Sequence, residues 1–418
     1  MSASRTLTAI SAPSAGRATV KSINAIVRDI VRNHSKTNFG LRLRQFGTFP
    51  LLSACVLAAL VWYDLLKFLH TPADSMSCHI HYRERQRSRL LLTLLAAAAL
   101  AALLVADLTT GSSGMSAKDV IAAVAAGPAS TEPNAVIVWS LRLPMALTAL
   151  LVGASLSLAG LSIQTITANA LASPSTLGIT SGASFGAAIA ITGGLTLFGE
   201  LWAGTITAAF IAALVICLLI LLLGRLKGMS PATLILAGII MNFFFVALQQ
   251  LLIYLASPET AQLINGWTFG NLERAGWLST AAAGAALLLG LIFLVPCAWQ
   301  LTSLSVGEER AKSLGVPVAR LRVIVFSAAS VLVAASVSFI GTIAFVGLVA
   351  PHCAKLLLGD DQRWLIPGSI FFGGFIMLLS SLVAKWLSAG AMLPIGIVTS
   401  IAGVPFLLVL LLKSRRDF

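Results

Sequence analysis

The chain has 418 residues, of which 58% are hydrophobic and 10% are charged, and its formal net charge at pH 7 is +13. So few charged residues cannot cover the surface of a soluble domain of this length, which leaves an α-helical membrane protein with many spans. The apolar runs are continuous, unlike the alternating segments of a β-barrel, and basic residues stand at their ends, so the membrane surface and not nucleic acid explains the charge.

Residues 1–75 differ from the rest of the chain in composition. Residues 1–45 are rich in Ser, Thr, Ala and Arg. The apolar run Pro50–Trp62 is short for a membrane span, and a span here would place the basic N-terminus outside, against the positive-inside rule. Met76 instead begins a basic flank that leads into an apolar helix. We therefore predict that residues 1–75 are a disordered extension or an over-long start assignment, with an interfacial helix or an eleventh span as the alternative, and that residues 76–418 are the transmembrane domain.

Charged residues divide the remaining sequence into apolar segments. The first predicted span is Leu90–Ala106, and the polar segment Asp107–Arg142 after it contains a short helical stretch near Ala117–Ala125. Residues 143–199 contain no Asp, Glu, Lys or Arg, which leaves room for two spans of about 20 residues each with a turn at Asn169–Ser175. The further expected elements are spans at Leu201–Gly224, Pro231–Ser257, Trp277–Pro296, Trp364–Ala384 and Leu393–Leu412, and a polar loop at Pro258–Gly276.

The apolar run at residues 323–358 is long enough for one long helix or for two shorter helices that turn at Gly341. With two helices the chain has ten spans, and both of its ends lie on the same side of the membrane. Most Lys and Arg residues between the spans then fall on that side as well, which identifies it as the cytoplasmic side. We therefore predict an all-α, polytopic membrane protein with ten transmembrane helices and both ends in the cytoplasm.

The predicted spans contain small and uncharged polar residues at regular places. Gly153 and Gly160, like Gly182 and Gly186, recur at helical spacing, which favours close helix packing. The polar residues within the spans are amides and hydroxyls, and they either join helices through hydrogen bonds or line a water-filled path. The amides are Gln164, Asn242, Gln249 and Gln250.

Several classes of chemistry have no counterpart in the sequence. No predicted span contains an Asp or Glu in its interior, although ion-coupled carriers commonly keep such a group. This disfavours an ion-coupled secondary transporter, which stays as one alternative, with a membrane scaffold or receptor as another. The sequence has no phosphate loop, HExxH or G-x-S-x-G motif, and its five cysteines lack disulfide or zinc spacing. We expect no catalytic residue, metal site or cofactor in this chain.

The segment Gly307–Arg322 is the densest cluster of charge between two long charge-free runs. The predicted topology places it in the cytoplasm. Ala311 and Leu314 are spaced so that both lie on one face of a short helix, and Gly315 is suited to end that helix. Because the chain has no ATP site of its own, we interpret this segment as a docking loop for a separate motor subunit.

Five motifs between about Leu90 and Arg416 resemble, in the same order, those of the FecCD-like permease subunits of type II ABC importers for iron-siderophores, haem and vitamin B12. The resemblance implies a ferric siderophore or related iron chelate as substrate, with haem or vitamin B12 as alternatives. It also implies a permease dimer of identical or different chains, two cytoplasmic ATPase subunits and an external solute-binding protein, in a bacterial cytoplasmic membrane. The motifs lie at Arg142–Gly186, Gly266–Leu272 (GWTFGNL), Gly307–Val316 (GEERAKSLGV), Phe345–His352 (FVGL and PH) and Leu393–Phe406.

The resemblance implies that two basic residues contact the external partner. Arg142 and Lys385 stand where family members use basic side chains at the outer mouth to meet acidic residues of the binding protein. Met145 replaces the second Arg of the family motif, so one such contact is missing or is made differently here.

The resemblance also implies roles at the cytoplasmic end. Asn169 and Leu171 stand where the family narrows the transport path, and Ala170 replaces the usual Pro between them. The residues that match the family's ATPase-coupling segment are Gly307, Glu308, Ala311, Leu314 and Gly315.

Overall fold

A computed structural model of the chain describes residues 97–111, 114–388 and 393–413. These residues form α-helices, one π-helical turn and their connections, with no strand among them. The predictions for residues 1–75 and for a natural start at Met76 lie outside the described residues.

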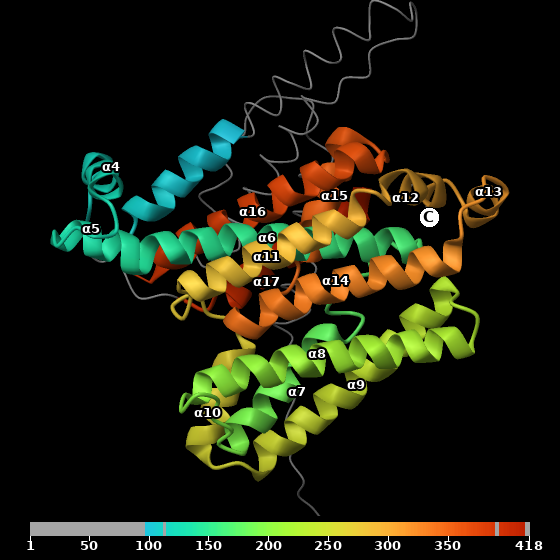
Figure 1. Cartoon of the computed structure of the whole chain (residues 1–418), viewed down its shortest axis with the longest axis horizontal. Helices are drawn as coiled ribbons and strands as arrows, with labels where there is room; N and C mark the ends of the chain where they lie inside the picture. The colour runs from blue at the N-terminus through green and yellow to red at the C-terminus, as the bar shows by residue number, and fades with distance from the viewer. Residues whose placement is uncertain (1–96, 112–113, 389–392, 414–418) are drawn as a thin grey trace, which may run out of the picture. The chain divides into compact units, whose positions relative to one another are not determined.

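Six described helices are long and apolar enough to cross a membrane, judged by length and composition. The chain is therefore a multi-pass membrane protein, and the long helices run largely alongside one another (Figure 1). The first of the six combines α5 (Pro133–Ile137), the π-helical turn η2 (Val138–Arg142) and α6 (Leu143–Thr167), and the others are α8 (Leu201–Leu226), α9 (Pro231–Leu255), α11 (Trp277–Leu294), α14 (Val318–Ile340) and α16 (Gln362–Leu387).

Four further apolar helices stand in the places of the remaining predicted spans. The count of ten membrane crossings and the cytoplasmic position of both ends stay predictions, because no membrane is part of the structure. The four helices are Ala97–Thr109, α7 (Ile179–Thr192), α15 (Val346–Leu358) and α17 (Ile395–Lys413).

Helix α6 is central to the fold, since it packs against α11, α14, α15 and α16. Its glycines permit this close packing, as the sequence pattern predicts. A Cβ at Gly160 would overlap the carbonyl of Gly347 in α15, and one at Gly153 would overlap the carbonyl of Gly373 in α16. A second group forms around α7, which packs against α8 and α9, with Gly182 and Gly186 at its contact with α8.

The run at residues 323–358 forms two helices, as predicted, and not one. Helix α14 ends at Ile340 and α15 begins at Val346, and the residues between them form no regular element. Gly341 has φ of 81°, and a Cβ there would overlap the carbonyl of Trp267. Both the left-handed backbone and the close approach require glycine at this turn.

Short helices occupy several connections. Helix α4 (Ala117–Ala126) confirms the predicted helical stretch and starts with a capping box between Ser116 and Asp119. The expected loop at Pro258–Gly276 was wrong in its first half, which forms α10 (Pro258–Thr268). Its sequence lacks an apolar run, but Ser257 caps its N-terminus and Pro258 takes the first helical position. Two more short helices, α12 (Ala298–Ser305) and α13 (Glu308–Ser313), lie at one end of the bundle, opposite α4 and α5 (Figure 1).

Candidate functional site

The charged segment forms the short helix α13, as predicted. Gly307 precedes it with φ of 135° and Gly315 follows it with φ of 79°, both conformations that favour glycine. Ala311 is fully buried against the chain itself, whereas Leu314 is 60% exposed. Although spacing predicts one shared face, Leu314 lies beyond the last turn, where its side chain is turned to the outside.

Glu308, the first residue of α13, forms two charged contacts. It accepts a 2.6 Å hydrogen bond from Nη2 of Arg322 and lies 3.0 Å from Nζ of Lys312. The hydrogen bond from Arg322 is the main cause that lowers the pKa of the Glu308 carboxyl. Arg322 is 3% exposed. Sequence reasoning gave Arg322 no role, because its charge looks like that of the exposed neighbours Arg310 and Arg320.

The connection between α6 and α7 carries Asn169 and Leu171 on an exposed turn. Ala168 has a left-handed backbone and ends α6. The Asn169 side chain then accepts a 2.9 Å hydrogen bond from the Leu171 backbone N–H, an arrangement that shapes a turn without proline. The side chain of Leu171 is half exposed. The turn therefore forms although Ala170 stands where the family has proline.

Arg142 and Lys385 lie at the other end of the described bundle, around the end of helix Ala97–Thr109. The Lys385 Nζ lies 2.6 Å from Oδ2 of Asp107, and both side chains are buried. Arg142 donates a 2.6 Å hydrogen bond to the carbonyl of Leu108 and is also buried. The sequence interpretation placed Asp107 at the start of a polar segment. This was wrong, because Asp107 belongs to the helix, where Lys385 compensates its charge.

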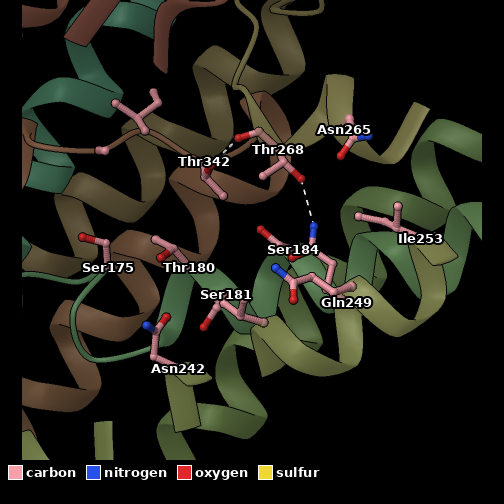
Figure 2. Close-up of a pocket in the computed structure, with 14 residues that line it drawn as sticks. Ser175, Thr180, Ser181, Ser184, Asn242, Gln249, Ile253, Asn265, Thr268 and Thr342 are labelled. Carbon is pink, nitrogen blue, oxygen red and sulfur yellow. Dashed lines mark hydrogen bonds between the residues drawn. The ribbon is translucent and has the colours of Figure 1, made fainter. Parts of the chain in front are cut away.

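A pocket of about 480 Å³ lies between α7, α9, α10 and the connection from α14 to α15 (Figure 2). None of the side chains that line it is Asp, Glu, Lys, Arg or His. Its polar surface consists of hydroxyls and amides alone, and Gln249 donates a 3.0 Å hydrogen bond to Thr268 within it. The polar lining residues are Ser175, Thr180, Ser181, Ser184, Asn242, Gln249, Gln250, Asn265, Thr268 and Thr342.

Two hydroxyls of this pocket lack a protein partner. Thr180 and Ser184 lie on α7 and are 6% and 3% exposed, and neither side chain has a hydrogen bond to any other described residue. Both hydroxyls belong to the pocket lining, so they are available to water or to a bound solute. They point to a wetted, ligand-accessible pocket.

The amides occupy two kinds of place in the structure. Gln164 joins two helices by a hydrogen bond to the Leu348 carbonyl at 3.4 Å, whereas Asn242, Gln249 and Gln250 line the pocket. The pocket hydroxyls were missed. Their signal is weak because Ser and Thr in apolar helices often bond only to a backbone carbonyl four residues earlier, as Ser162 does.

Comparisons with known proteins agree on one family. The sequence model of the FecCD transport family matches residues 94–413. An ABC transporter permease protein of Methanocaldococcus jannaschii is 38% identical over 67% of this chain and 82% of its own length. An iron chelatin transport system permease protein of Helicobacter pylori is 37% identical over 67% and 83%. The hemin transport system permease protein of Yersinia pestis is 33% identical over 67% and 84%.

Further relatives are named for other substrates, which include molybdate, iron(3+)-hydroxamate and cobalamin. Among solved structures, a metal-chelate type ABC transporter in an inward-facing conformation is similar, with a TM-score of 0.67 and 33% identity. The match covers 77% of this chain and 98% of that chain. The similarity thus extends over nearly the whole of the related subunit.

Proposed function

The chain belongs to the FecCD transport family and is an ABC-importer permease, and on this premise we propose that it carries a ferric siderophore or a related iron chelate across the bacterial cytoplasmic membrane. Three observations support this substrate class, and haem and vitamin B12 stay the alternatives because relatives are named for them as well. One relative is named for an iron chelatin and another for iron(3+)-hydroxamate, and the similar solved structure is of a metal-chelate type transporter.

The pocket is the observation that carries the proposal. Ferric chelates hold the metal through oxygen donors that face inward and leave the amides and other uncharged polar groups of their backbone at the outer surface, so they need hydrogen-bonding partners along their path. The hydroxyl and amide lining of the pocket supplies donors and acceptors without a fixed charge. Such a lining binds an oxygen-rich solute weakly enough for it to leave again, as conduction requires.

The energy comes from a separate ATPase subunit that docks on α13. The exposed Leu314 is the apolar contact offered to this partner, and the glycines at 307 and 315 fix the two ends of the helix. Asn169 and Leu171 narrow the cytoplasmic end of the path, on a turn that is exposed and so free to meet the solute or a second permease chain. A dimer, of identical or different chains, completes the path.

The external solute-binding protein docks at the end that holds Arg142 and Lys385. Both side chains are buried in the single chain, and Lys385 is paired with Asp107. An acidic side chain of the binding protein therefore competes with Asp107 for Lys385. Docking then loosens the end of helix Ala97–Thr109, next to the mouth.

Uptake in reconstituted vesicles tests the proposal. Vesicles contain this permease with its ATPase, receive the cognate binding protein loaded with a radioactive ferric hydroxamate, haem or cobalamin, and are supplied with ATP. We expect ATP-dependent uptake of the ferric chelate, and none when the ATPase is omitted. Uptake that needs no ATPase, or that follows a proton gradient, would revive the ion-coupled carrier. Uptake of haem or cobalamin alone would reassign the substrate.

A further inference from the structure

Arg322 joins three elements that are far apart in the sequence. It lies in the second turn of α14, is 3% exposed, and donates hydrogen bonds from all three nitrogens of its guanidinium group. Nη2 donates to Oε2 of Glu308 at 2.6 Å, Nε to the carbonyl of Ile166 at 3.1 Å, and Nη1 to the carbonyl of Met229 at 2.9 Å.

The two carbonyls have structural reasons to bind a cation. Ile166 lies in the last turn of α6, where carbonyls lack a helical N–H partner and the helix dipole favours positive charge. Met229 lies in the connection from α8 to α9, with a left-handed backbone at φ of 54°. The guanidinium group is planar and rigid, so it fixes these carbonyls relative to Glu308 of α13.

Each carbonyl precedes, in the chain, a helix that lines the pocket. Ile166 lies 13 residues before α7, and the connection between them carries Asn169, Leu171 and the pocket residue Ser175. Met229 lies two residues before Pro231, where α9 begins. Arg322 thus joins α13 to the two connections that lead into α7 and α9, while Arg322 itself is buried and is not among the residues that line the pocket.

We propose that Arg322 is a positioning residue that transmits the movement of α13, through Glu308, to the connections that start α7 and α9, so that ATP turnover on the partner opens and closes the pocket. This inference rests on the proposed docking of the ATPase on α13. When α13 shifts, the Glu308 carboxylate moves Arg322, and Arg322 moves both carbonyls together. Without this link the ATPase turns over while the solute path stays still.

The test measures uptake per ATP hydrolysed in vesicles that contain the complete complex. The variants are Arg322→Gln, Glu308→Gln, the double variant and Arg322→Lys. Arg225→Gln is the matched control, because Arg225 is an exposed arginine near the end of α8 and lies outside the docking segment Gly307–Arg322. We expect at least a tenfold loss of uptake per ATP in both single Gln variants, with the ATPase still bound and active. The double variant should lose no more than either single one, since both act through one contact.

Arg322→Lys tests whether the three hydrogen bonds of the guanidinium group are needed or whether a positive charge at this position is enough. Lys in place of Arg322 keeps the charge and the contact with Glu308 but cannot hold three acceptors in one plane, so we expect partial recovery. Uptake per ATP within twofold of the wild type in Arg322→Gln, or equal to that of Arg225→Gln, would overturn the proposal. Should Arg322→Gln fail to assemble, Glu308→Gln decides alone, because Glu308 is partly exposed and its loss leaves Arg322 bound to both carbonyls.

A second pair of variants shows which proposal has failed. Leu314→Arg places charge at the exposed position of α13 and is expected to abolish binding of the ATPase. If the ATPase still bound this variant and uptake were normal, the docking site itself would be wrong. If Leu314→Arg abolished binding but the Arg322 and Glu308 variants transported normally, only the link through Arg322 would be wrong.

Discussion

Asp107 and Lys385 form a buried ion pair although 278 positions separate them in the sequence. The sequence predicts that Lys385 and Arg142 lie on one side of the membrane, because their positions relative to the spans follow from counting. The sequence cannot predict that Lys385 and Arg142 converge on one helix end, because the residues around a lysine do not indicate which acidic residue it pairs with. Asp107 was assigned to a polar segment for the same reason. An acidic residue next to an apolar run is typical of a loop, and the sequence does not show the lysine that compensates its charge within a helix.

The ion pair predicts a non-additive pattern of stability. Lys385→Met removes the ammonium partner of the buried Asp107 carboxylate. Asp107→Asn removes the carboxylate partner of the buried Lys385 ammonium. Each single change is expected to lower the free energy of unfolding by about 3–5 kcal/mol. The double variant removes both charges and is expected to cost less than either single one. Thermal unfolding of the purified protein in detergent measures this, with Lys118→Met as an exposed control. Equal and additive losses would argue against the pair.

Glu308 predicts a pH dependence of defined sign. The hydrogen bond from Arg322 lowers its pKa from the ordinary 4.5. A carboxyl whose folded pKa is lowered adds stability above its unfolded pKa and loses it as pH falls through the folded pKa. The difference in thermal midpoint between the wild type and Glu308→Gln should therefore be constant around neutral pH and shrink only below 4.5. A difference that varies near pH 7 would show that another group controls the contact.

At the scale of elements, the sequence predicts helices where long apolar runs or glycine signals exist. The division at Gly341 follows from charge parity, and α13 follows from the spacing of Ala311 and Leu314 and from Gly315, which is suited to end the helix. Helix α10 was missed because its stability comes from a serine cap, an N-terminal proline and burial of Ile264 and Trp267, none of which produces an apolar run. A helix held by tertiary contact leaves little trace in hydropathy.

From the close contact between α6 and α15 we predict how one added methyl group changes the free energy of unfolding. In Gly160→Ala the new Cβ would overlap the Gly347 backbone, so the helices must separate, at a cost of about 1–3 kcal/mol. Gly266→Ala is the matched control in α10, where no atom lies within 4 Å of the added Cβ, and it should be neutral or stabilising by up to about 1 kcal/mol. Detergent thermal unfolding compares the two. Similar midpoints for both variants would mean that α6 and α15 adapt without cost.

At the scale of the molecule, the proposed function assigns each described region one part of transport. In that proposal the end with Asp107 and Lys385 meets the external partner, α13 meets the ATPase, and the pocket between α7 and α9 offers uncharged polar groups to the solute. Hydropathy and motif order predict the first two regions, because both interrupt apolar runs. The pocket could be predicted only in part, from its amides, because a hydroxyl on a packed helix and one on a solute path look alike in sequence.

Ser184 tests whether the pocket conducts the solute. Ser184 is 3% exposed and its hydroxyl makes no hydrogen bond within the described part of the chain, so Ser184→Ala removes no internal hydrogen bond and should change uptake per ATP less than threefold. Ser184→Asp adds a charge to a lining that has none. A ferric hydroxamate would then have to pass a fixed, poorly hydrated carboxylate, and we expect at least a tenfold loss of uptake at unchanged ATPase binding. If both variants transported equally well, the solute would pass elsewhere, and the uncharged lining would serve only to join α7, α9 and α10.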